Sequence, residues 1–156
     1  IDGDYEYVVL FDVDLKQIDL EEVRTALDKI QDQEIDMIIM NKVAPNPDYK
    51  ITNKLTVYSR IACILSGERV LKLKDLKQIL KLRPRGYQLE AVINKYMIDQ
   101  EKTVKWVESN IYHPYAYDEG MPVMAKKYSK MAISIIKKIG IMSFAEQLTS
   151  YCTEEA

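Results

Sequence analysis

The sequence has few of the residues that metalloenzymes and many hydrolases use for chemistry. Its 156 residues include two cysteines and one histidine, His113. Cys63 and Cys152 lie far apart and form no CxxC pair, so a zinc site of the Cys/His type is nearly excluded. Any Ser-His-Asp or Cys-His catalytic arrangement would have to use His113. Two isolated thiols are consistent with a reducing compartment, and we expect a cytoplasmic protein.

Glycine, proline and long apolar runs are also scarce. Five Gly and five Pro exclude collagen-like and linker-like chains. The longest apolar runs cover only a few residues, as at 37–40, whereas a transmembrane helix needs roughly 20, so we expect no membrane span and no membrane partner. The N-terminal stretch is acidic where a signal peptide has a basic region. The chain starts at Ile1 rather than Met, which indicates a fragment or the ordered part of a longer protein.

What remains is the composition of one globular domain, with 47% hydrophobic and 29% charged residues. Residues 5–11 (YEYVVLF) and 34–41 (EIDMIIMN) indicate two buried strands. A helix capped by Asp19 connects them, and a helical crossover predicts that the two strands form a parallel pair. Residues 69–74 alternate and predict a third strand. We therefore expect an α/β (α+β) fold whose core, residues 1–74, holds a small mixed or parallel sheet of about three strands.

Beyond this core the pattern becomes helical. We expect residues 75–156 to form a helical half that packs on the core, so that residues 1–156 make a single domain. The longest helical pattern extends over 87–112, with a drift that allows two helices in its place. The other predicted helices of this half are 76–82, 123–139 and 144–152.

Charge is distributed unevenly along the chain. The net charge is −2, but residues 1–36 carry twelve Asp and Glu against three Lys and Arg, which is −9. The remaining residues carry nineteen basic against twelve acidic side chains, which is +7. Such segregation indicates either an acidic site facing a basic one or an intramolecular match of two surfaces, and we favour the second.

Three carboxylates are the candidates for metal chemistry. Asp4 and Glu6 stand at the start of the first predicted strand, and residues two apart on a strand point to the same face. Asp36 lies near the start of the second strand. If these strands are neighbours, the three carboxylates converge at one edge of the sheet, and oxygen ligands suit Mg²⁺ and phosphoryl transfer. On these residues alone, solvated acids at strand ends are the favoured interpretation.

Residues 3–73 resemble the later two thirds of a minimal nucleotidyltransferase domain of the polymerase β superfamily. That family has a D-x-D that leads a strand, a helix, a strand with a third acid and an N-x-A-P segment, then a helix, a glycine and a short strand. The resemblance covers somewhat under half of the chain. The matching segments here are 3–11 (GDYEYVVLF), 34–41 (EIDMIIMN), 43–45 (VAP), 55–65, Gly67 and 69–73.

The resemblance implies that Asp4, Glu6 and Asp36 bind Mg²⁺, that Asp36 also accepts the proton of the attacking hydroxyl, and that a nucleotide is the ligand. Two departures stand against activity. Glu6 replaces an aspartate, and no G-S-x-x-R-G segment precedes the strand. Either the N-terminus is missing, or this is a degenerate, nucleotidyltransferase-like pseudoenzyme. A second D-x-D pair, Asp12 and Asp14, follows the strand and indicates a loop.

A basic stretch, residues 69–85, offers a different function. It contains Asp75 as its only acid, so its side chains can neutralise phosphates, and we consider a nucleic-acid-binding accessory protein. No aromatic residue is interleaved within this stretch before Tyr87, so a stacking platform for single strands is not indicated. The favoured alternative is a solvated helix face. A non-catalytic interaction subunit, bound to a protein partner or to a second copy, also stays open. The candidate nucleic-acid-binding residues are Arg69, Lys74, Lys77, Lys81, Arg83 and Arg85.

Overall fold

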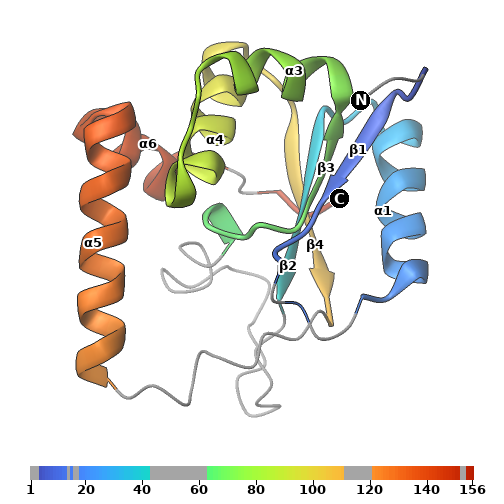
Figure 1. The fold of residues 1–156 in the computed structure, drawn as a ribbon. Coiled ribbons are helices and arrows are strands. Elements are labelled where there is room, and N and C mark those ends of the chain that lie inside the picture. Colours follow the sequence, from blue (N-terminus) through green and yellow to red (C-terminus); the bar gives the residue numbers. More distant parts are fainter. Residues whose placement is uncertain (1–3, 14, 16–17, 43–62, 111–120, 152–153) are drawn as a thin grey trace.

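The computed structural model describes residues 4–13, 15, 18–42, 63–110, 121–151 and 154–156 of the chain. These residues form an α/β fold in which helices cover both faces of a mixed sheet (Figure 1). The strands are β1 (Tyr7–Leu10), β2 (Met37–Lys42), β3 (Arg69–Lys72) and β4 (Val104–Ser109). The helices are α1 (Leu20–Asp32), α3 (Leu73–Lys81), the 3₁₀ turn η1 (Gly86–Gln88), α4 (Leu89–Asp99), α5 (Met121–Ile139) and α6 (Ile141–Ser150).

The strand order in the sheet is β1-β3-β2-β4. β3 is antiparallel to both β1 and β2, and β2 is parallel to β4. The predicted strands β1 and β2 therefore run in the same direction, but they are not neighbours, because β3 lies between them. The prediction of a directly paired parallel β1 and β2 was wrong. The order of elements along the chain does not determine which strand is inserted between two others.

Alternation along β2 divides the hydrophobic core into two layers. Met37 and Ile39 pack with side chains of α3 and α4. Ile38 and Met40 point to the opposite face and pack with Val23, Ala26 and Ile30 of α1. These four residues of β2 are fully buried, which explains why they form a continuous apolar run.

The start of α1 follows the predicted capping. The side chain of Asp19 accepts a 2.9 Å hydrogen bond from the backbone N–H of Glu21, which satisfies one of the free donors at the helix end. Val23, Ala26 and Ile30 form the buried face of the helix, and the other residues are partly or fully exposed. The predicted helix is therefore confirmed, and it covers one face of the sheet (Figure 1).

The predicted helical stretch 87–112 is partly wrong, because its second part is a strand. α4 ends at Asp99, and Glu101 has a φ of 50° that takes the backbone out of the helical conformation. The following residues, VKWVES, include two valines and a tryptophan, which favour a strand, and they pair in parallel with β2. Within the described residues the sheet therefore has four strands instead of about three, and the fourth comes from the half of the chain predicted to be helical.

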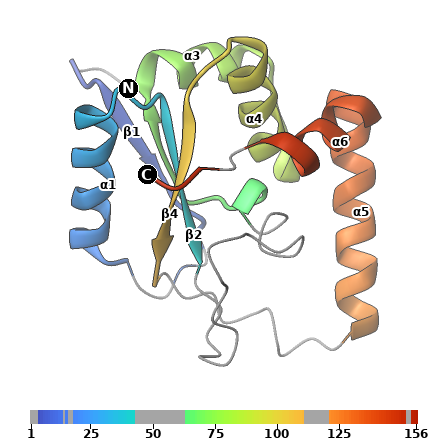
Figure 2. The same ribbon diagram turned by 180° about the vertical axis from the view of Figure 1, so that it is seen from behind.

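The C-terminal residues return to the sheet. After α5 and α6, which lie at the end of the molecule away from α1 (Figure 2), Glu155 forms a parallel bridge with Trp106 at the edge of β4. The predictions for 44–47, for most of the helix 55–65 and for the histidine loop at 113–120 lie outside the described residues. Among the helices described, none is both long and apolar enough to cross a membrane.

Candidate functional site

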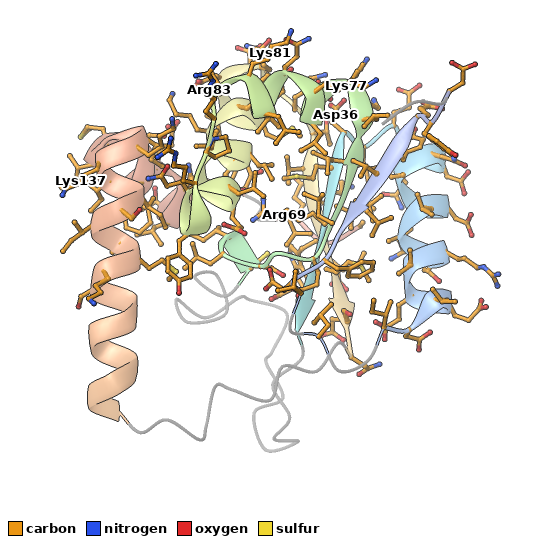
Figure 3. The ribbon with its side chains drawn as sticks, viewed as in Figure 1. Asp36, Arg69, Lys77, Lys81, Arg83 and Lys137 are labelled. Atoms are coloured by element: carbon orange, nitrogen blue, oxygen red, sulfur yellow. The ribbon has the colours of Figure 1, made fainter. Side chains whose placement is uncertain are left out.

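Asp36, the predicted catalytic acid, lies directly before β2, and both of its carboxylate oxygens are hydrogen-bonded within the protein. Oδ1 accepts hydrogen bonds from Lys72 Nζ at 2.9 Å and from Lys102 Nζ at 3.3 Å. Oδ2 accepts a hydrogen bond from the backbone N–H of Thr103 at 3.1 Å. These partners come from β3 and from the turn before β4, so the carboxylate ties together three strands at one end of the sheet (Figure 3).

The pKa values of this pair show that both groups are held in their charged forms. Burial raises the pKa of Asp36, but the hydrogen bonds from Lys72 and Thr103 and the charges of the two lysines outweigh it, so the pKa lies below its usual value. The hydrogen bond to Asp36 raises the pKa of Lys72 against the effect of burial. An aspartate with a lowered pKa is a poor proton acceptor, which disfavours the predicted role of Asp36 as a general base.

Further polar contacts connect the Asp36 ion pairs to α3 and α4, the helices that cover this end of the sheet. Lys102 Nζ lies 3.7 Å from Oδ2 of the buried Asp75 on α3. Oδ1 of Asp75 accepts a 3.0 Å hydrogen bond from the hydroxyl of Tyr96 on α4. Burial, and then the hydrogen bond to Asp75, raise the pKa of Tyr96. The result is a network of alternating charges that joins α3, α4 and the sheet.

Asp4 and Glu6, the other predicted metal ligands, are exposed residues before β1. Because β3 separates β1 from β2, and neighbouring strands lie about 4.8 Å apart, the backbones that carry Glu6 and Asp36 are separated by about 10 Å. No group of three or more His, Cys, Asp or Glu side chains among the described residues is arranged to hold a metal ion. The residues present therefore do not fit the predicted Mg²⁺ site, in which Asp36 would also have to release two lysines.

Arg69, the first of the predicted nucleic-acid-binding residues, is fully buried, and its assignment to a nucleic-acid surface was wrong. Its Nε and Nη2 donate to the carbonyls of Ser66 and Ile64 at 2.7 and 2.8 Å, and its Nη1 donates to Oδ1 of Asn94. Asn94 is in turn hydrogen-bonded to Gln147 of α6. The guanidinium thus joins β3, α4 and α6 in the interior.

Sequence reasoning missed this role because the partners of the arginine are distant in sequence. Asn94 lies 25 residues after Arg69, and nothing in their local patterns links them. Glu90 of α4 belongs to the same environment. Burial raises its pKa, while the positive charge of Arg69 acts in the opposite direction. A buried arginine with several hydrogen bonds and acidic neighbours is a structural group, so it is unable to contact a phosphate.

The other five predicted basic residues are exposed. α3 buries Leu73, Leu76 and Ile79 against the core, and the opposite face of the helix carries lysines. The two arginines follow in the segment between α3 and η1. Asp75, the only acid between residues 73 and 89, is turned inward. We call this surface the α3 basic surface; it consists of Lys74, Lys77, Lys81, Arg83 and Arg85.

Figure 3 shows Lys77, Lys81 and Arg83 along the outer side of α3, pointing away from the sheet. Lys138 of α5 extends this surface, because its Nζ donates a 2.8 Å hydrogen bond to the carbonyl of Leu82 at the end of α3. No sequence signal places Lys138 there, since the two residues are 56 positions apart. Lys137, by contrast, points away from α3 (Figure 3).

No protein-family model matches this sequence, and comparison with curated proteins finds no significant match. The resemblance to minimal nucleotidyltransferases therefore stays a prediction. Of the two candidate sites, the carboxylate site lacks the required arrangement, and the basic site keeps five of its six predicted residues at the surface.

Proposed function

We propose that this protein is an accessory nucleic-acid-binding protein, and that the α3 basic surface contacts the phosphate backbone. One observation carries the proposal: five cationic side chains are exposed within twelve residues, 74–85, and the only acid among them, Asp75, is buried. When a surface with this charge binds a polyphosphate, it displaces the cations condensed on the phosphates, and this release supplies most of the affinity of non-specific binding.

The geometry of the helix supports contact with a linear polyanion. Lys74, Lys77 and Lys81 follow one another at intervals of three and four residues, so they share one face of α3. A helix of nine residues is about 13 Å long, which is the length of a few nucleotides. The buried apolar face fixes the helix on the sheet, so the lysines are presented without prior folding of the helix.

The charge of the opposite side of the molecule is complementary to this assignment. α1 covers the other face of the sheet and has exposed acids, among them Glu21 and Asp28. A polyanion is repelled there and attracted to α3. The uneven distribution of charge therefore orients the protein, so that α3 and not α1 faces a polyanionic ligand.

The test is a charge-reversal experiment on the complete chain. Lys77→Glu combined with Lys81→Glu is compared with wild type for binding of a labelled 12-nucleotide single strand and of a duplex at about 0.1 M salt. The matched control is Lys130→Glu combined with Lys137→Glu, which makes the same change in net charge on exposed residues of α5. Thermal unfolding of each variant shows that the fold is intact.

The proposal predicts that the α3 variant binds both oligonucleotides at least roughly 25-fold more weakly, because two phosphate contacts are lost. The α5 control stays within a few-fold of wild type. An equal loss of affinity in both variants would mean that only the net charge of the protein matters, and this would overturn the proposal. Binding to vesicles of anionic phospholipid, with no binding to either oligonucleotide, would overturn it as well.

A further inference from the structure

Tyr87 is an exposed aromatic side chain at the end of the α3 basic surface. It lies in η1, two residues after Arg85, and 48% of its surface is accessible. Stretches of basic residues that bind duplex phosphates need no aromatic group, whereas proteins that bind single strands combine basic grooves with aromatic side chains on which bases stack. The position of Tyr87 therefore bears on which form of nucleic acid is bound.

The turn that carries Tyr87 is fixed on both sides. The backbone N–H of Arg85 donates to Oε1 of Gln88 at 3.1 Å, and Nε2 of Gln88 donates to Oγ of Ser134 on α5 at 3.2 Å. Gly86 has a φ of 52°, a conformation that side chains disfavour, and it allows the tight turn between Arg85 and Tyr87. An aromatic ring on an anchored turn loses little conformational entropy when a base stacks on it.

We infer that the protein prefers single-stranded over duplex nucleic acid, and that a base stacks on Tyr87 while Arg83 and Arg85 contact the adjacent phosphates. This inference rests on the proposed function. In a duplex the bases are already stacked on one another, so Tyr87 finds no free base face and only the charges contribute. In a single strand the base faces are available, and the tyrosine adds to the charge interaction without sequence preference.

The exposed surroundings of Tyr87 favour a base over a purely ionic contact. Leu80 and Leu82, near the end of α3, are also about half exposed, at 48% and 52%. Nucleobases have apolar faces and polar edges, and a surface with both cationic and apolar groups is complementary to them.

The test compares Tyr87→Leu and Tyr87→Phe with wild type, using a 12-nucleotide oligothymidylate and a 12-base-pair duplex in the same buffer. Tyr87→Leu should weaken binding of the single strand about 5- to 100-fold and leave duplex binding within twofold. Tyr87→Phe keeps the ring and should bind both as wild type does. The control is Tyr5→Leu, because Tyr5 is another exposed tyrosine, 67% accessible and located before β1.

The outcomes separate this inference from the proposed function. If Tyr87→Leu binds both oligonucleotides as tightly as wild type, while the Lys77→Glu and Lys81→Glu variant binds neither, stacking is overturned and the charge surface stands. An equal loss for single strand and duplex in Tyr87→Leu also overturns stacking. If wild type binds neither oligonucleotide, both proposals fail.

Discussion

Lys72 and Asp36 face each other across β3 and β2, where the lysine Nζ donates a 2.9 Å hydrogen bond to Oδ1 of the aspartate. Their side chains are 22% and 15% accessible, so the pair is largely shielded from water. Lys102 approaches the same oxygen from the turn before β4. Asp36, which the sequence predicts to be a metal ligand, therefore belongs to an ion-pair network at one end of the sheet.

Replacing Asp36 with Asn should lower the free energy of unfolding by about 1.5–3 kcal/mol, because the partly buried Lys72 loses its ion-pair partner and Lys102 keeps only Asp75. The contribution should depend on pH. The folded pKa of Asp36 is lowered from 3.8, so the stabilisation is complete above that value and is lost as pH falls through the folded pKa. The folded pKa of Lys72 is raised from 10.5, so its share is complete below that value and is lost as pH rises through the folded pKa.

Urea unfolding at several pH values measures this effect. The control is Asp28→Asn, which removes an exposed carboxylate from α1 and should change stability little. If both substitutions cost the same, or if Asp36→Asn is neutral at pH 7, the structural role of the ion pair is wrong.

Arg69→Met should destabilise the protein by about 3–5 kcal/mol, since it removes a buried cation and leaves the carbonyl of Ser66 and Oδ1 of Asn94 without their donor. Arg85→Met, on the exposed turn, should change stability by less than about 0.5 kcal/mol. Chemical denaturation with both variants makes the comparison. A stable Arg69→Met protein that no longer binds oligonucleotides would assign Arg69 to the ligand instead of to the core.

Gly67 packs so closely against Asp12 that a side chain at position 67 would force the Asp12 carboxylate to move. A Cβ at this position would lie 2.1 Å from Oδ1 of Asp12. Gly67→Ala should therefore lower the free energy of unfolding by about 1–3 kcal/mol. In an Asp12→Ala background the same substitution should cost less, because the carboxylate is gone. A double-mutant cycle with no coupling energy would show that the two residues do not touch.

Arg83 has a φ of 51°, a left-handed conformation that favours glycine, and its N–H donates to the carbonyl of Leu80 after the end of α3. Arg83→Gly should leave the free energy of unfolding unchanged or raise it by up to about 1 kcal/mol. On the proposed function it should also weaken oligonucleotide binding about fivefold at 0.1 M salt.

Arg85 provides the comparison, because its φ is −131° and glycine brings no relief there. Arg85→Gly should weaken binding to a similar extent and lower stability by about 0.5 kcal/mol. The two substitutions should therefore weaken binding alike, while only Arg85→Gly lowers the free energy of unfolding. If Arg83→Gly binds as wild type does, Arg83 does not contact the nucleic acid, and its proposed role is wrong.

The sequence was sufficient for the elements whose signals are local. The cap at Asp19, the apolar run of β2 and the lysine face of α3 are each set by neighbouring residues, and the structure has all three. The α/β class follows from their order. The predicted boundary between β3 and α3 was wrong, because the helix begins at Leu73, where the strand was predicted to continue.

What the sequence did not provide depends on contacts between distant segments. The insertion of β3 between β1 and β2 is decided by pairing over many residues, and it separates Glu6 from Asp36. The burial of Arg69 depends on Asn94 in another helix. Strand β4 was hidden because the apolar positions of VKWVES also fit a helical stripe, and only its pairing with β2 distinguishes the two.

The salt dependence of single-strand binding tests the central claim most directly. The logarithm of the association constant of wild type for a 12-nucleotide oligothymidylate should fall linearly with the logarithm of salt concentration. Five cations set a limit of about −3.5 for the slope, and Lys77→Glu with Lys81→Glu should make it shallower by about 1.4. A slope near zero, or the same slope in both proteins, would contradict binding through the outer face of α3.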